Sequence, residues 1–143
     1  MAKLESSVTI NAPVEKVFAY GSKPENQPEY WPSLIEVKNV KELPNGGYSY
    51  DFVYKLAGVR LSGSSEDTEF VPNERLVSVS KGGIESKFTW LFQPADGGTY
   101  LAVEVEYTVP VPVLGKFAES VIVGQLEKEA EVILHNFKTI LEA

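Results

Sequence analysis

Apolar and polar side chains alternate with a period of two over most of residues 35–107. From Tyr48 to Leu56 every second residue is Tyr, Phe or Leu, and from Leu101 to Tyr107 the residues between apolar ones include two glutamates. This alternation is typical of strands with one buried and one wet face. Turn sequences rich in Gly, Pro and Asn separate the segments and favour hairpins. We predict six strands, at about residues 35–43, 48–56, 59–71, 75–80, 84–92 and 100–110.

A looser alternation over residues 3–10 predicts one further strand before these six. Asn11-Ala12-Pro13 then marks the start of a short helix that ends near Gly21-Ser22, because proline suits the first turn of a helix. The segment Pro24–Pro32 predicts a second short helical stretch, and its three prolines keep it short. The chain therefore begins with a strand followed by two short helices.

The predicted strand over residues 59–71 contains an irregularity. Its apolar residues change from odd to even positions between Leu61 and Phe70. A bulge shifts the alternation by one residue, and we expect it near Gly63-Ser64-Ser65. Arg60 and Glu69 on this strand are compatible with a surface ion pair or with a buried one.

From Pro112 to Ala143 the period changes to that of a helix. The predicted buried stripe consists of Ile122, Leu126, Ala130, Ile133, Phe137 and Ile140. A second apolar group, Leu114, Phe117 and Val121, lies well away from that stripe. Either loops cover this end, with a kink near Gly124, or the group forms the lip of a ligand entrance or a dimer contact.

Composition narrows the classes of function. The chain has 143 residues, which favours a single domain over residues 1–143, and it has no Cys, a net charge of −7 and no basic patch. A nucleic-acid partner is disfavoured, as nucleic-acid binders carry clustered basic residues. No apolar run reaches the length of a membrane span, and no signal-like run begins the chain. We expect a cytoplasmic protein that is a monomer or a weak homodimer.

Sequence motifs for metal or nucleotide chemistry are missing. His135 is the single histidine and falls on the predicted wet face of the long helix, so neither a Ser-His-Asp arrangement nor a histidine metal cluster can be assembled. The glycine pairs lie in hairpins and are not followed by a helix, unlike a phosphate-binding loop. We expect no metal and no cofactor, and no catalytic residue can be named.

The order of elements and four segments resemble the START-like, or SRPBCC, superfamily, which includes the Bet v 1-like proteins. The segments are Val8–Phe18, Glu29–Ser33, Phe88–Pro94 with Asp96–Thr99, and Pro110–Ala143. Within this group the chain is similar to bacterial polyketide cyclase/dehydrase-type lipid-binding proteins. The resemblance implies an α+β helix-grip fold: a seven-stranded curved antiparallel sheet around a long C-terminal helix, with two short helices between strands 1 and 2.

The resemblance also implies a cavity between sheet and long helix. Its expected wall is Tyr50, Phe52, Tyr54, Phe88, Trp90, Val103, Val105 and Tyr107. Trp31, Ile122 and Leu126 would close it, and Phe117 would lie at its lip. The loops around Gly58, Gly82-Gly83 and Val109–Leu114 would form the entrance. Alternatively, these large side chains fill a solid core.

The expected function is the binding of a hydrophobic or aromatic small molecule, such as a lipid or polyketide-like compound. Apolar burial would drive binding, and the hydroxyl groups of Tyr50, Tyr54 and Tyr107 would orient a ligand oxygen. Two alternatives remain. A cyclase or dehydratase acting on a polyketide-like substrate needs a polar group with a shifted pKa inside the cavity. A non-catalytic interaction or assembly module would use the Leu114, Phe117 and Val121 group.

Overall fold

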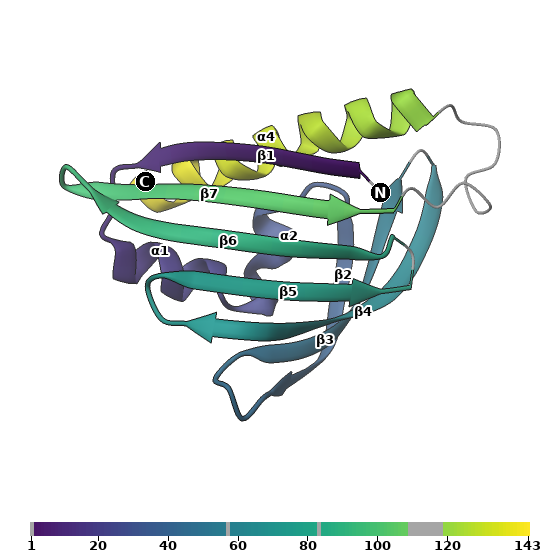
Figure 1. Cartoon of the computed structure of the whole chain (residues 1–143), viewed down its shortest axis with the longest axis horizontal. Helices are drawn as coiled ribbons and strands as arrows, with labels where there is room; N and C mark the ends of the chain where they lie inside the picture. Colours follow the sequence, from purple (N-terminus) through teal and green to yellow (C-terminus); the bar gives the residue numbers. More distant parts are fainter. Residues whose placement is uncertain (1, 57, 83, 109–118) are drawn as a thin grey trace.

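The computed structural model describes residues 2–56, 58–82, 84–108 and 119–143, with residues 2 and 119–122 described by their backbone alone. Strands and helices follow in the order predicted (Figure 1). They are β1 (Ala2–Ile10), α1 (Val14–Gly21), η1 (Pro24–Asn26), α2 (Gln27–Tyr30), β2 (Leu34–Glu42), β3 (Tyr48–Leu56), β4 (Val59–Val71), β5 (Arg75–Lys81), β6 (Ser86–Ala95), β7 (Gly98–Tyr107) and α4 (Glu119–Glu142).

The strands form one antiparallel sheet in the order β1-β7-β6-β5-β4-β3-β2. Strands β2 to β7 each pair with their neighbour in sequence, whereas β1 lies beside β7 at the opposite edge from β2. Figure 1 shows α4 running along β1, and β2 and β3 curling back toward the side on which α1 and α2 lie. This is the Bet v 1-like helix-grip α+β fold, and the predicted fold class is confirmed.

The C-terminal end of α4 is tied to the start of the chain by polar contacts. The Asn11 amide donates a hydrogen bond to Glu142 Oε2 at 2.8 Å, and Lys138 Nζ donates to the Thr9 carbonyl at 2.9 Å. Lys16 Nζ of α1 donates to the Leu141 carbonyl at 3.2 Å. These contacts fix the end of the long helix over the junction of β1 and α1.

The short helices begin and end where the sequence indicates. Pro13 precedes α1 in an extended conformation, and Val14, Val17 and Phe18 form its buried face. Gly21 is the last residue of α1, and it lies close to α4, since a Cβ there would be 3.0 Å from the Phe137 ring. The hairpin between β2 and β3 is also confirmed, because the Leu43 amide bonds the Gly47 carbonyl at 2.8 Å across the turn.

The bulge in β4 exists, but its predicted position was wrong. Pairing of β3 with β4 is continuous from Ser49–Glu66 to Leu56–Val59, so residues 63–65 are regular. The register changes between Asp67 and Glu69, in the pairing with β5. Gly63 is required because a Cβ would lie 2.4 Å from the Lys81 carbonyl oxygen. Gly63 therefore lies where β4 closely approaches the end of β5, and it is not the site of a bulge.

Other boundaries differ by a few residues. The segment predicted over 84–92 forms β6 from Ser86 to Ala95. The hairpin turn after it contains only Asp96 and Gly97, and both of these residues have a positive φ. Strand β7 ends at Tyr107. The stretch 109–118, which holds Leu114, Phe117 and the expected entrance loop, lies outside the described residues.

An aromatic core closes one end of the molecule. The ring of Phe18 packs edge-to-face on Phe92, with centroids 4.9 Å apart, and on Phe70 at 5.2 Å. Phe137 of α4 is 1% exposed and its ring contacts those of Tyr30 at 4.3 Å and Trp90 at 5.8 Å. Such well-packed ring pairs anchor α1 and α4 to the sheet.

The charged residues considered above lie at the surface. His135 and Arg60 are exposed. Glu69 pairs with Arg75, not with Arg60, at 3.1 Å, and both of these side chains are more than two-fifths exposed. Among the described residues, no helix is long and apolar enough to cross a membrane. No group of three His, Cys, Asp or Glu in the described part of the chain is arranged to hold a metal ion.

Candidate functional site

A cavity lies between α2, α4 and the inner face of the sheet, with a free volume of about 110 Å³. Nine of the predicted residues line it: Trp31, Tyr50, Phe52, Tyr54, Phe88, Trp90, Val105, Tyr107 and Leu126. Val103 does not line the cavity and belongs to the packed core, where it is 4% exposed. Phe117 and the side chain of Ile122 lie outside the described residues. Contact of any of these residues with a ligand stays a prediction.

The aromatic wall is continuous because its rings contact one another. Trp31 lies 5.3 Å from Phe88, measured between ring centroids, and Phe88 stacks on Trp90 at 6.4 Å with an interplanar angle of 16°. On β3, Phe52 and Tyr54 lie 5.7 Å apart. These rings narrow the space to less than the ~300 Å³ at the lower end of ordinary ligand pockets. The cavity therefore contains free space, but with the side chains in their present positions it holds only about one ring-sized group.

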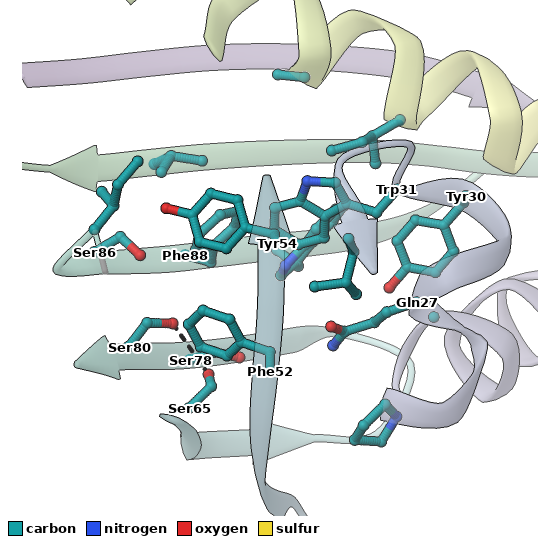
Figure 2. A pocket seen from close by; sticks show the side chains of 18 of the residues that line it. Gln27, Tyr30, Trp31, Phe52, Tyr54, Ser65, Ser78, Ser80, Ser86 and Phe88 are labelled. Atoms are coloured by element: carbon teal, nitrogen blue, oxygen red, sulfur yellow. Dashed lines mark hydrogen bonds between the residues drawn. The ribbon is translucent and has the colours of Figure 1, made fainter. Parts of the chain in front are cut away.

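A polar strip crosses the inner face of β4 and β5 (Figure 2). Ser65 and Asp67 of β4 and Ser78 and Ser80 of β5 all line the cavity and are all buried. Ser80 Oγ donates to Ser65 Oγ at 3.2 Å, and Ser78 Oγ donates to Asp67 Oδ1 at 2.8 Å. The strip gives one wall of an otherwise apolar cavity the capacity to bond ligand oxygens or nitrogens.

Asp67 has a structural role as well as a place in the cavity. Its Oδ2 accepts the Tyr48 amide at 2.8 Å, and its carbonyl accepts Asn45 Nδ2 at 2.8 Å, so it holds the β2–β3 hairpin against β5. Burial raises the pKa of the Asp67 carboxyl, while the hydrogen bonds from Ser78 and Tyr48 act in the opposite direction. The result is a carboxyl group in a fixed position that is easier to protonate than one in water.

Tyrosine hydroxyl groups surround the same space. Gln27 Nε2 of α2 donates to the Tyr50 hydroxyl oxygen at 2.8 Å. Burial raises the pKa of both Tyr30 and Tyr50 above the ordinary value. Burial also raises the pKa of Tyr54, and the nearby charge of Glu129 adds to that effect. All three side chains therefore stay neutral near pH 7 and act as hydroxyl donors or acceptors rather than as bases.

Glu129 is the charged group that α4 contributes to the cavity lining. Trp31 Nε1 donates to its Oε1, and Ser33 Oγ donates to its Oε2. The carboxylate thereby links α4 to the segment between α2 and β2, which also carries the indole ring of the aromatic wall. These two bonds use half of the acceptor positions, because an ionised carboxylate offers about four.

The sequence interpretation missed the polar strip and Glu129. The alternation from Leu61 places Ser65 and Asp67 on the inner face, but a bulge assigned to residues 63–65 hid them. On β5, Ser78 and Ser80 lie two and four residues after the buried Leu76, so they face the same side of the sheet as Leu76. Glu129 was missed for another reason. It interrupts an apolar stripe of α4, and its hydrogen-bond partners Ser33 and Trp31 lie 96 and 98 residues away in the sequence.

Comparison with family models matches residues 1–142 to one family, described as polyketide cyclase / dehydrase and lipid transport. The chain belongs to this family. Among curated proteins the sequence has no match. The family description covers both enzymes and lipid carriers, so membership leaves the choice between binding and catalysis to the geometry of the cavity.

Solved structures share the fold at low identity. TTHA0849 from Thermus thermophilus superposes with a TM-score of 0.84 at 18% identity, covering 96% of this chain and 95% of that one. Ara h 8.0201 gives 0.70 at 16% identity, covering 98% and 97%. BexL, a di-domain ARO/CYC protein of the BE-7585A biosynthetic pathway, gives 0.79 at 18% identity, covering 99% of this chain and 50% of that one. These likenesses show the fold.

Proposed function

We propose that this protein binds a hydrophobic or aromatic small molecule, of the lipid or polyketide-like class, in the cavity between the sheet and α4. The observation that carries the proposal is that an aromatic wall and a buried polar strip line the same hollow space. Ligand sites of this type combine apolar walls with a few orienting polar groups. Family membership supports the same class of ligand.

The size of the ligand follows from the free volume. About 110 Å³ accepts one ring or a short alkyl branch. A larger lipid or polycyclic compound requires Trp31 and Phe88 to change rotamer, and Trp31 is only partly buried. We therefore expect small aromatic compounds to bind to the cavity as it stands, and larger ones to bind with repacking of this wall.

A filled-cavity variant and a matched surface variant test the proposal. Ser80→Leu places a large side chain inside the cavity, whereas Ser64→Leu makes the same change on the exposed face of β4. With the neutral fluorescent probe N-phenyl-1-naphthylamine, Ser80→Leu should lower affinity at least tenfold and Ser64→Leu should leave it unchanged. Native mass spectrometry after organic extraction would then identify any co-purifying compound. If the parent protein binds neither this probe nor the single-ring compound 2-phenylethanol, or if both variants lose affinity equally, the proposal is contradicted.

A second candidate is catalysis of the cyclase or dehydratase type, supported by Asp67. A buried carboxyl group with a raised pKa and nearby tyrosine hydroxyl groups is a recurring arrangement for acid–base work. Its test is product formation from a poly-β-ketone model substrate, followed by mass spectrometry. Asp67→Asn should abolish the product, whereas Asp96→Asn in an exposed turn should not. Equal turnover in both variants would exclude Asp67 as the acid.

The state of assembly and the location are further proposals. A monomer or weak homodimer is consistent with a 143-residue chain that has a core of its own. A solved structure with a TM-score of 0.69 and 12% identity is described as the Aha1 dimer from Colwellia psychrerythraea. Sedimentation over a hundredfold range of concentration would separate the two states. A cytoplasmic location is supported by the lack of Cys and is testable by fractionation.

A further inference from the structure

The charge of the cavity lining is one-sided. Its described members include two carboxyl groups, Asp67 and Glu129, and no Lys, Arg or His. A ligand that enters this space leaves water and meets carboxyl groups, with no cationic side chain among the described lining residues. A carboxylate or phosphate on the ligand is therefore disfavoured by both desolvation and repulsion.

Of the two carboxyl groups, Glu129 is the one available to a ligand. Asp67 is committed to Ser78 and the Tyr48 amide, and burial favours its neutral form. From the described residues, each Glu129 oxygen accepts one hydrogen bond, and a carboxylate oxygen can accept two. No ion pair of Glu129 is present among the described residues.

The sequence of α4 explains why Glu129 has no cationic partner on its own helix. Positions three and four residues away hold Gln125, Leu126, Val132 and Ile133, none of them basic. On a helix surface these are the positions from which a Lys or Arg would pair with it. Leu126 and Ile133 instead belong to the cavity lining, so the carboxylate lies beside the apolar face of the helix.

The rings next to Glu129 have the chemistry of a cation site. Trp31 donates its indole N–H to the carboxylate and packs against Phe88 with ring centroids 5.3 Å apart. The hydroxyl group of Tyr54 is close enough for the charge of Glu129 to affect its pKa. Aromatic faces attract ammonium groups, and tryptophan does so most strongly.

We propose that the preferred ligand of this cavity carries a protonated amine, with the ammonium group at the Glu129 carboxylate and its apolar body against Trp31 and Phe88. This inference rests on the proposed binding function and narrows it to a ligand class. The cavity selects a small aromatic or apolar amine over a neutral compound of equal size, and rejects the matching carboxylate.

Three single-ring probes of similar size test the charge preference by calorimetric titration at pH 7. They are phenethylammonium, 2-phenylethanol and 3-phenylpropanoate. We expect the ammonium compound to bind about tenfold or more tightly than the alcohol, because both can donate to the Glu129 carboxylate but only the ammonium group adds attraction between opposite charges. The carboxylate should bind most weakly. Equal affinity of amine and alcohol, or tighter binding of the carboxylate, would overturn the inference while leaving the proposed function standing.

Two variants of α4 locate the effect. Glu129→Gln removes the charge in the cavity, and Glu131→Gln removes one charge from the exposed face of the same helix. The amine preference should disappear in Glu129→Gln, with the affinity for 2-phenylethanol changed less than about twofold, and should persist in Glu131→Gln. An unchanged preference in Glu129→Gln would overturn the assignment. If neither the three probes nor N-phenyl-1-naphthylamine bind the parent protein, the proposed function itself fails.

Discussion

The two ends of the inner face of the sheet differ in how they are packed. Around α1 and the C-terminal half of α4, large apolar side chains pack densely: Phe137 is 1% exposed, Phe92 3% and Leu101 0%. Around α2 and the first half of α4, the same sheet carries serines, an aspartate and a hollow space. One end stabilises the fold through dense packing, whereas the other keeps buried polar groups and free volume that a purely structural core would exclude.

The same substitution at the two ends should cost very different amounts. Phe137→Ala removes a ring from the packed end and should lower the free energy of unfolding by about 3–5 kcal/mol. Phe88→Ala removes a partly exposed ring from the cavity wall and should cost about 1–2 kcal/mol. Urea denaturation of both variants measures the difference. Equal costs would show that the cavity wall is packed as tightly as the core.

Asp67 tests the polar strip, because its carboxyl group is buried at the hollow end. Asp67→Asn leaves an amide in place of an acceptor that bonds both Ser78 and the Tyr48 amide. The amide keeps only one acceptor oxygen, so if that oxygen accepts the Tyr48 N–H, the Ser78 hydroxyl must turn and accept from the new NH2 group. The loss should be about 1–3 kcal/mol at acid pH.

The effect of Asp67→Asn should depend on pH in a defined direction. The carboxyl titrates near 3.8 when unfolded and at a higher pH when folded. Between those two values the folded chain holds more protons, so its stability falls as pH rises. The advantage of the parent protein over Asp67→Asn should therefore be fully present below pH 3.8 and shrink as pH rises through the raised pKa. Denaturant unfolding between pH 3.5 and 7 measures this, and an advantage that grows with pH would contradict the raised pKa.

Trp31 tests the link between α4 and the segment before β2. Trp31→Phe keeps an aromatic ring but removes the N–H that donates to Glu129, and should cost about 1–2 kcal/mol at this partly exposed site. The same change in a Glu129→Gln background should cost less, because the charged acceptor is already gone. A double-mutant cycle gives the coupling energy directly. Additive effects would mean that the Trp31–Glu129 hydrogen bond contributes nothing to stability.

The packed end and the sheet could be predicted from sequence because their signals are local. Alternation from Tyr48 to Leu56 assigns β3 with its observed bounds, and the turn before Tyr48 fixes the hairpin. Pro13 similarly marks the start of α1. Each of these features depends on neighbours within a few residues, so the chain alone contains the information.

The hollow end could be predicted only in part because its signals are long-range. A misplaced bulge moved Asp67 off the inner face, since the parity change visible in the sequence does not say at which residue it occurs. Glu129 looks like a solvated charge until Trp31 and Ser33 are brought against it from the other end of the chain. The aromatic wall residues named from the sequence lie around the cavity, whereas Val103 does not line it. Free volume depends on how the aromatic rings pack, and no spacing rule gives it.

The smallest effect is expected within the polar strip itself. Ser80 Oγ donates to Ser65 Oγ over 3.2 Å, a long bond between two neutral groups, so Ser80→Ala should cost only about 0.5 kcal/mol. Ser78→Ala removes a 2.8 Å bond to a carboxylate and should cost several times more. Urea denaturation of both variants measures this ratio. If Ser80→Ala costs as much as Ser78→Ala, the Ser65–Ser80 hydrogen bond contributes substantially to holding β4 and β5 together. If it costs little, the Ser80 hydroxyl group contributes to what the cavity can bind more than to the stability of the sheet.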